Sequence, residues 1–168
     1  MILAEFARTI RNSGLFTAVR QSQYFYPIVL STHLTCIAIF GGMILATNLR
    51  LLGWAFPTAP AGELIRTLRP WKHAGLTLMV TCGILLAGAK ADSYYPNTFF
   101  RLKMFLLCLL IAHSVFFRSV YRDTAALDSA KETPPRAKLA AALSLLLWLA
   151  VICAGRWIAY WDSPKAIF

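Results

Sequence analysis

The feature that most constrains this chain is a run of 29 residues, 21–49, that contains no Asp, Glu, Lys or Arg. A helix needs about 20 mostly apolar residues to cross the hydrocarbon core of a bilayer. The run is therefore long enough for a complete membrane span with a polar start. Two further charge-free runs of 17 residues each, 73–89 and 139–155, predict a second and a third span.

A shorter charge-free run of 14 residues, 104–117, lies between the last two. Its length alone fits either a buried helix or a span. Lys103 and Arg118 flank it, and such basic side chains can extend their charged ends to the membrane surface while their stems stay in the apolar region. Phe99 and Phe100 lengthen the apolar segment. We therefore predict a fourth span here.

The composition supports a membrane protein, because 58% of the 168 residues are hydrophobic and 14% are charged, with a mean hydropathy of +0.60. Average soluble proteins are about half apolar and about one quarter charged. This excess of apolar residues excludes a soluble domain, and it excludes intrinsic disorder. The net charge of +10 would suggest nucleic acid as the partner of a soluble protein. No basic stripe with interleaved aromatic residues lies outside the apolar runs, so we exclude nucleic acid and expect these residues to meet lipid headgroups.

We predict an all-α fold, a four-helix transmembrane bundle that forms a single membrane domain over residues 1–168. The predicted spans cover about residues 27–51, 71–91, 100–120 and 139–160. Prolines are expected to separate them, at Pro57, Pro60, Pro70, Pro96 and Pro134–Pro135. The architecture implies a multi-pass protein in the lipid bilayer, which we expect to be the bacterial inner (cytoplasmic) membrane.

The N-terminal segment, residues 2–20, is predicted to form an interfacial amphipathic helix. Helices with one apolar face and one basic face lie in the membrane interface instead of crossing the bilayer. Apolar residues recur here at helical spacing with two arginines between them: Ile2, Leu3, Phe6, Ile10, Arg8 and Arg11.

All three histidines, His33, His73 and His113, fall within predicted spans. An ionisable residue at membrane depth is costly and is a functional hypothesis by default. The simpler interpretation is a neutral imidazole that forms a hydrogen bond between helices. Because none of the three lies in a loop, we favour a role in coordination.

The expected depths of the histidines suggest how they pair. At a rise of about 1.5 Å per residue, His73 and His113 fall in the same leaflet. Two imidazoles on facing helices can hold one haem iron from opposite sides, which predicts haem b as the cofactor. Gly75 offers a small surface beside His73.

His33 is expected in the opposite leaflet, at the depth of Met104 and Arg156. His33 with Met104 would form a second pair of axial ligands, although Met104 also fits ordinary packing. Arg156 interrupts an apolar helix, so it could bind a propionate or a quinone oxygen, or extend to the headgroups. We assign Lys103 to the same second site.

Copper is the alternative metal. Thiolate and thioether ligands suit Cu(I), whereas cysteine is also a common packing residue in apolar cores. All four cysteines are expected near the membrane centre: Cys36, Cys82, Cys108 and Cys153.

The chain resembles a bacterial four-helix membrane family of unknown function in three runs: YPIVLSTHLTCIAIFGGMILATNLRLLG, LRPWKHAGLTLMVTCGILLAG and LLLWLAVICAGRWIAY. It is also similar to the HemJ-type membrane proteins of haem biosynthesis, which carry His, Gly and Arg in their first helix and Lys and His in their third. The matching positions are His33, Gly42, Arg50, Lys103 and His113. This resemblance implies His33 as a haem ligand.

Two other similarities bear on the metal. Copper-resistance membrane proteins have a similar first helix. The architecture also resembles four-helix b-type membrane cytochromes, which normally present four histidines for two haems. This chain has three, so two complete bis-histidine haems within one chain are excluded.

We therefore predict a membrane b-type cytochrome-like protein that binds haem within the bundle and transfers electrons to or from a quinone or redox partner. Such a protein would be a membrane oxidoreductase or an electron-transfer subunit, working with a redox partner subunit or as a homo-oligomer. The alternatives are a non-redox membrane anchor or assembly subunit, and a copper-handling membrane protein.

Overall fold

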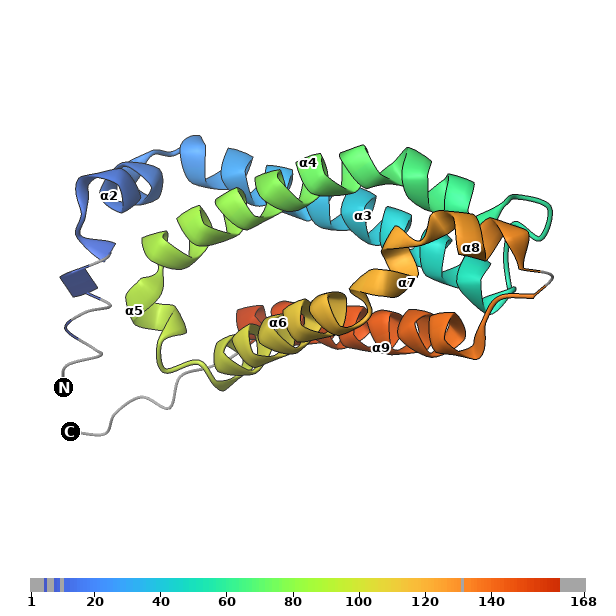
Figure 1. The fold of residues 1–168 in the computed structure, drawn as a ribbon. Helices are drawn as coiled ribbons and strands as arrows, with labels where there is room; N and C mark the ends of the chain where they lie inside the picture. The colour runs from blue at the N-terminus through green and yellow to red at the C-terminus, as the bar shows by residue number, and fades with distance from the viewer. Residues whose placement is uncertain (1–4, 6–7, 10, 131, 161–168) are drawn as a thin grey trace.

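The computed structural model describes the whole chain except residues 1–4, 6–7, 10, 131 and 161–168 (Figure 1). The described residues form helices and no strand. Four of the helices are long, and four are short and connect or flank them, with a terminal 3-10 turn. They are α2 (Gly14–Gln21), α3 (Phe25–Leu52), α4 (Ala61–Ala89), α5 (Ala91–Tyr94), α6 (Thr98–Phe116), α7 (Arg118–Arg122), α8 (Thr124–Ser129), α9 (Pro135–Trp157) and η1 (Ile158–Tyr160).

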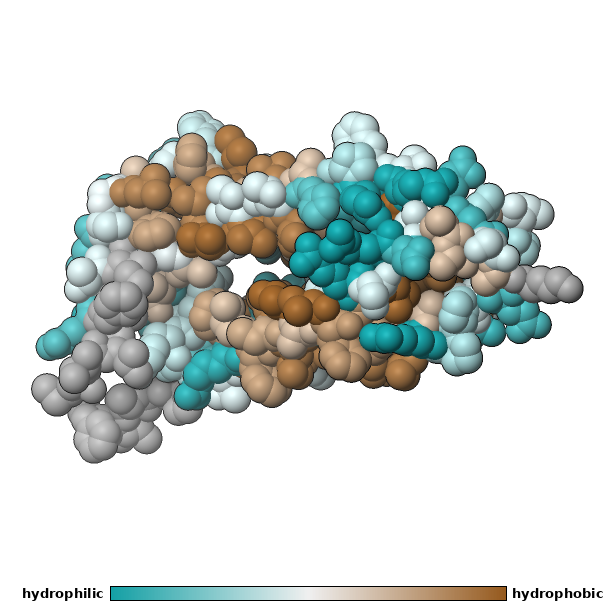
Figure 2. Space-filling model, viewed as in Figure 1, coloured by the Kyte–Doolittle hydropathy of each residue, from teal (hydrophilic) through white to brown (hydrophobic). Residues whose placement is uncertain are grey.

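The four long helices are α3, α4, α6 and α9, and each is apolar and long enough to cross a membrane. Their apolar side chains cover much of the outer surface of the molecule, which is the surface that lipid would contact (Figure 2). Backbone groups in lipid must be paired within the protein, and a helix pairs them all within one segment. The predicted all-α fold with four transmembrane helices is confirmed.

The start of α4 differs from the prediction. The helix begins at Ala61 instead of residue 71, and Pro70 lies inside it. Pro60 caps α4 with an extended backbone, and Ala61 and Ile65 are buried against Leu127 of α8. This packing stabilises the first turns of α4, so Pro70 removes one backbone hydrogen bond without ending the helix.

The predicted third span also ends early. α6 stops at Phe116, and Phe117 leaves helical geometry with φ −94° and ψ 14° before α7 begins at Arg118. Residues 118–122 therefore form a separate short helix beyond the span.

The predicted N-terminal helix over residues 2–20 is represented by α2. Ser13 precedes α2 in an extended conformation, with φ −66° and ψ 149°. Val19 is buried, and the ring of Phe16 lies against Gly88 of α4. α2 therefore packs on the bundle, whereas the apolar residues Ile2, Leu3, Phe6 and Ile10 lie outside the described residues.

The long helices form two layers, α3 with α4 and α6 with α9 (Figure 1). The layers meet where α3 packs against α9. α4 and α6, both fully described, share no comparable interface. The space-filling view shows an opening between the two layers (Figure 2).

The centre of the α3–α9 contact is aromatic. Phe40 and Trp148 are both buried, with their rings edge to face at 5.3 Å between centroids. A Cβ added at Gly41 would lie 2.7 Å from Nε1 of Trp148, so only glycine lets α3 approach α9 this closely.

A buried polar network connects three helices near one end of the bundle. Asn48 of α3 is 2% exposed and donates from Nδ2 to Oγ of Ser144 in α9 at 2.9 Å. The hydroxyl of Tyr121 in α7 donates to Oδ1 of Asn48 at 3.3 Å. Burial raises the pKa of Tyr121 to about 12, so the hydroxyl remains protonated and able to donate at neutral pH.

Replacing Asn48 with leucine should lower the free energy of unfolding by about 1–2 kcal/mol, because Ser144 and Tyr121 lose their buried partner. Reversible denaturation in mixed micelles measures this change. Thr81→Val is the matched control, since its hydroxyl is exposed and bonds only within its own helix. Equal stability of the two variants would mean that the network contributes nothing.

Candidate functional site

His33 is half-buried on α3 and held by the backbone of α4. Its Nδ1 lies 2.9 Å from the carbonyl oxygen of Met79. A carbonyl only accepts hydrogen bonds, so Nδ1 carries the proton, and Nε2 of the neutral ring keeps its lone pair. Ring nitrogens that bind metals are oriented in this way, with the other nitrogen donating to a carbonyl or carboxylate.

Gly83 makes room for this ring. A Cβ at Gly83 would lie 3.2 Å from Cε1 of His33, closer than side chains normally approach. The absence of a side chain at position 83 therefore allows the His33 ring to lie against α4.

Lys103 reaches the same region from α6. The ammonium is half-buried and lies within electrostatic range of the His33 ring. Its Nζ would be 3.4 Å from a Cβ at Gly155 of α9. In the described part of the chain, no hydrogen bond or ion pair engages Lys103. An ionisable side chain inside a span is a functional hypothesis by default.

His33, Gly83, Lys103 and Gly155 together define what we call the interior site. Each of the four spanning helices contributes one of these residues. His33 and Gly83 belong to one layer, and Lys103 and Gly155 belong to the other, so the site lies between the layers. Within the fully described spans, α4 and α6 share no interface comparable to those between α3 and α4 or between α6 and α9.

His113 contacts the neighbouring helix through Nε2, whereas His33 does so through Nδ1. Its Nε2 lies 3.0 Å from the carbonyl oxygen of Ala140, and its ring is 4.9 Å from that of Phe117. Nε2 therefore donates to α9 and ties α6 to it. His113 therefore fits the simpler interpretation of the three histidines, in which a neutral imidazole forms a hydrogen bond between two helices.

His73 is exposed on α4. In the described part of the chain, no hydrogen bond or ring contact joins His73 to His113, whose ring contacts Ala140 and Phe117 instead. Gly75 faces Phe40 and Met43 of α3 at ordinary contact distances, so it is part of the α3–α4 packing. The His73–His113 haem pair stays a prediction that no described contact supports.

Met104 and Arg156 are both exposed. Met104 is 45% exposed. Arg156 is exposed as well, donates to the hydroxyl of Tyr160, and has its guanidinium carbon 4.6 Å from the centre of that ring. No described contact joins either residue to His33. The pairing with Tyr160 favours the role of Arg156 as an anchor near the end of α9.

The cysteines divide into two groups. Cys36 and Cys82 are buried, whereas Cys108 and Cys153 are exposed. Among the described residues, no three His, Cys, Asp or Glu side chains converge as a metal cage would require.

Sequence reasoning missed Gly83 and Gly155. The only available signal was that glycine is rare in the middle of apolar helices without a packing reason. That signal does not show which helix each glycine faces, because the facing helix depends on how the helices pack together.

The fold defines a multi-pass membrane protein with four spanning helices and one interior site to which all of them contribute. Residues 14–161 match DUF6644, a family of unknown function, and the chain belongs to that family. This confirms the resemblance to a four-helix membrane family of unknown function. No curated protein and no solved structure matches the chain.

Proposed function

We propose that this protein is a b-type membrane haem protein that carries electrons between a quinone or redox partner and another carrier, with His33 as the iron ligand. The observation that carries the proposal is the hydrogen bond from Nδ1 of His33 to the carbonyl of Met79. It fixes the tautomer, leaves Nε2 free to bind a metal and holds the ring in one orientation.

The other residues of the interior site suit a haem. Gly83 leaves room for the His33 ring, and Gly155 leaves room for the Lys103 side chain, so both groups can lie inside the bundle. The ammonium of Lys103 would neutralise a propionate carboxylate inside the bundle. Bound haem would supply reversible one-electron chemistry, and the helices would supply ligation and exclusion of water.

A non-redox role as a membrane anchor or assembly subunit is the second candidate. The hydrogen bond from His113 to Ala140 favours it, because there an imidazole simply ties two helices together. His33 makes a similar bond to Met79, so the two candidates differ in whether Nε2 of His33 has a ligand.

The visible spectrum of the purified protein tests the proposal. After expression with an adequate haem supply, we expect a Soret band and a reducible α band, with haem in stoichiometric amount by pyridine haemochrome assay. Protein that is folded and free of haem under these conditions would contradict the proposal. Copper by elemental analysis without haem would instead favour the copper-handling alternative.

A further inference from the structure

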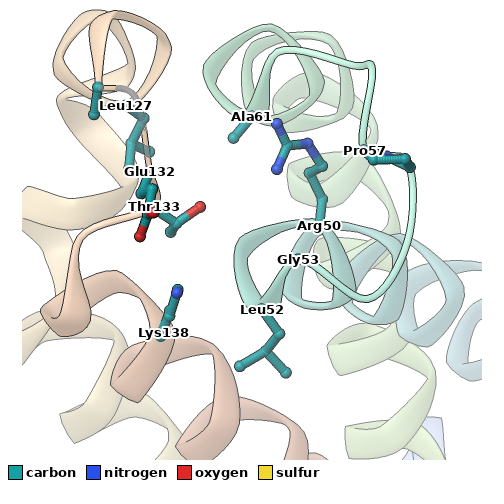
Figure 3. A pocket seen from close by; sticks show the side chains of 10 residues that line it. Arg50, Leu52, Gly53, Pro57, Ala61, Leu127, Glu132, Thr133 and Lys138 are labelled. Atoms are coloured by element: carbon teal, nitrogen blue, oxygen red, sulfur yellow. The ribbon is translucent and has the colours of Figure 1, made fainter.

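A polar cavity of about 270 Å³ lies at the end of the bundle where α3 ends and α9 begins (Figure 3). One wall comes from the α3–α4 connection, and the other comes from α8 and the segment that follows it. The polar residues that line it are Arg50, Glu132, Thr133 and Lys138. This cavity is separate from the interior site.

The two basic residues extend into the cavity from different sides (Figure 3). Nε of Arg50 donates to the carbonyl of Ala59 at 2.5 Å, which orients the guanidinium. The terminal nitrogens of Arg50 and the ammonium of Lys138 have no hydrogen bond or ion pair within the described residues. Both cations are therefore available to a ligand.

The charge of the cavity limits that ligand. Among the described residues that line the cavity, Arg50 and Lys138 carry two positive charges and Glu132 carries one negative charge, which gives a net charge of one positive. A monoanion balances this lining, whereas a dianion would leave an excess negative charge close to the Glu132 carboxylate.

The position of the cavity points to phosphate as the anion. Arg50 is near the end of α3 and Lys138 is in the first turns of α9, so both lie at the ends of spanning helices. Phospholipid headgroups, each with a phosphodiester, lie at this depth. The planar fork of arginine binds phosphate oxygens in pairs, and the Thr133 hydroxyl adds a donor.

We propose that this cavity binds a monoanionic phosphate group, which the membrane supplies as a phospholipid headgroup. Arg50 and Lys138 hold the phosphate oxygens, and Glu132 disfavours ligands with more than one negative charge. The proposal is independent of haem binding, because no residue of the interior site takes part.

Native mass spectrometry of the full-length detergent-solubilised protein tests the proposal with three probes: phosphatidylglycerol, diacylglycerol with the same acyl chains, and inorganic phosphate. We expect phosphatidylglycerol to be retained more strongly than diacylglycerol. Lys138→Gln should weaken that retention about tenfold, since it removes one charged partner of the phosphate. Glu132→Gln should leave the retention unchanged or strengthen it.

Arg136→Gln is the matched control, because Arg136 is an exposed cation on the same turn of α9 that does not line the cavity. Equal retention in Lys138→Gln and wild type, or an equal loss in Lys138→Gln and Arg136→Gln, would overturn the proposal. Retention of inorganic phosphate with the same dependence on Lys138, but no retention of phosphatidylglycerol, would keep the site and assign it to free phosphate.

Discussion

Replacing His33 with alanine should abolish the Soret band of the purified protein. The imidazole would supply the iron ligand through Nε2, and alanine has no atom that can replace it. The same substitution removes the hydrogen bond to Met79, so the fold must be checked separately. Absorbance spectra, haem content and helix content by circular dichroism together separate loss of the ligand from loss of the fold.

His33→Asn makes this test sharper. Nδ2 of asparagine takes the place of the imidazole Nδ1 and can still donate to the carbonyl of Met79, so the α3–α4 contact is largely kept while Nε2 is lost. We expect this variant to fold like the wild type and to lose the haem band as well.

His73→Ala is the matched control, because His73 is exposed on α4 and is not one of the residues of the interior site. Its spectrum should match the wild type. An unchanged spectrum in His33→Ala, with loss of the band in His73→Ala and His113→Ala, would instead assign the iron to the pair that the sequence suggested.

A second large effect is expected at Gly62, where α4 meets α8. A Cβ at position 62 would lie 2.2 Å from the carbonyl oxygen of Thr124 and 2.6 Å from Oδ2 of Asp128. The backbone N–H of Gly62 also donates to Oδ1 of Asp128 at 2.7 Å. Gly62→Val should therefore separate the two helices and lower the free energy of unfolding by about 3 kcal/mol.

Gly42→Ala is the matched control for this effect, since nothing lies within 4 Å of a Cβ at position 42. It should be neutral or stabilise the protein by about 0.5–1 kcal/mol, because alanine favours the helix. Reversible unfolding in mixed micelles compares the two variants. A Gly62→Val variant as stable as wild type would mean that α8 does not pack against α4 in this way.

Gly62→Val should also leave the haem spectrum unchanged, because Gly62 lies at the opposite end of α4 from Gly83. By contrast, it should weaken phosphatidylglycerol retention, since Leu127 of α8 lines the cavity with Arg50 and Lys138. This combination separates the two sites in a single variant.

The sequence by itself determined the class of the protein and the number of its spans. Long runs without charge, such as residues 21–49, can satisfy their backbone in lipid only as helices. A helix pairs its backbone groups within its own segment, so each span could be predicted without knowing which other helices pack against it. The same reasoning could not place the start of α4, because Ala61 and Ile65 are held by contacts with α8 that extend the helix through Pro70.

The arrangement of the histidines was decided only by the tertiary structure. The rise per residue gives the depth of a side chain along its helix. Depth was the basis for predicting His73 with His113, and His33 with Met104, as pairs of haem ligands. Rotation of each helix about its axis depends on which helices pack together, and here α3 packs on α4 and α9 while α6 packs on α9. That packing points His33 and Lys103 into one site and leaves His73, Met104 and Arg156 exposed. Depth is a local property of the chain, whereas the direction of a side chain depends on contacts between distant segments.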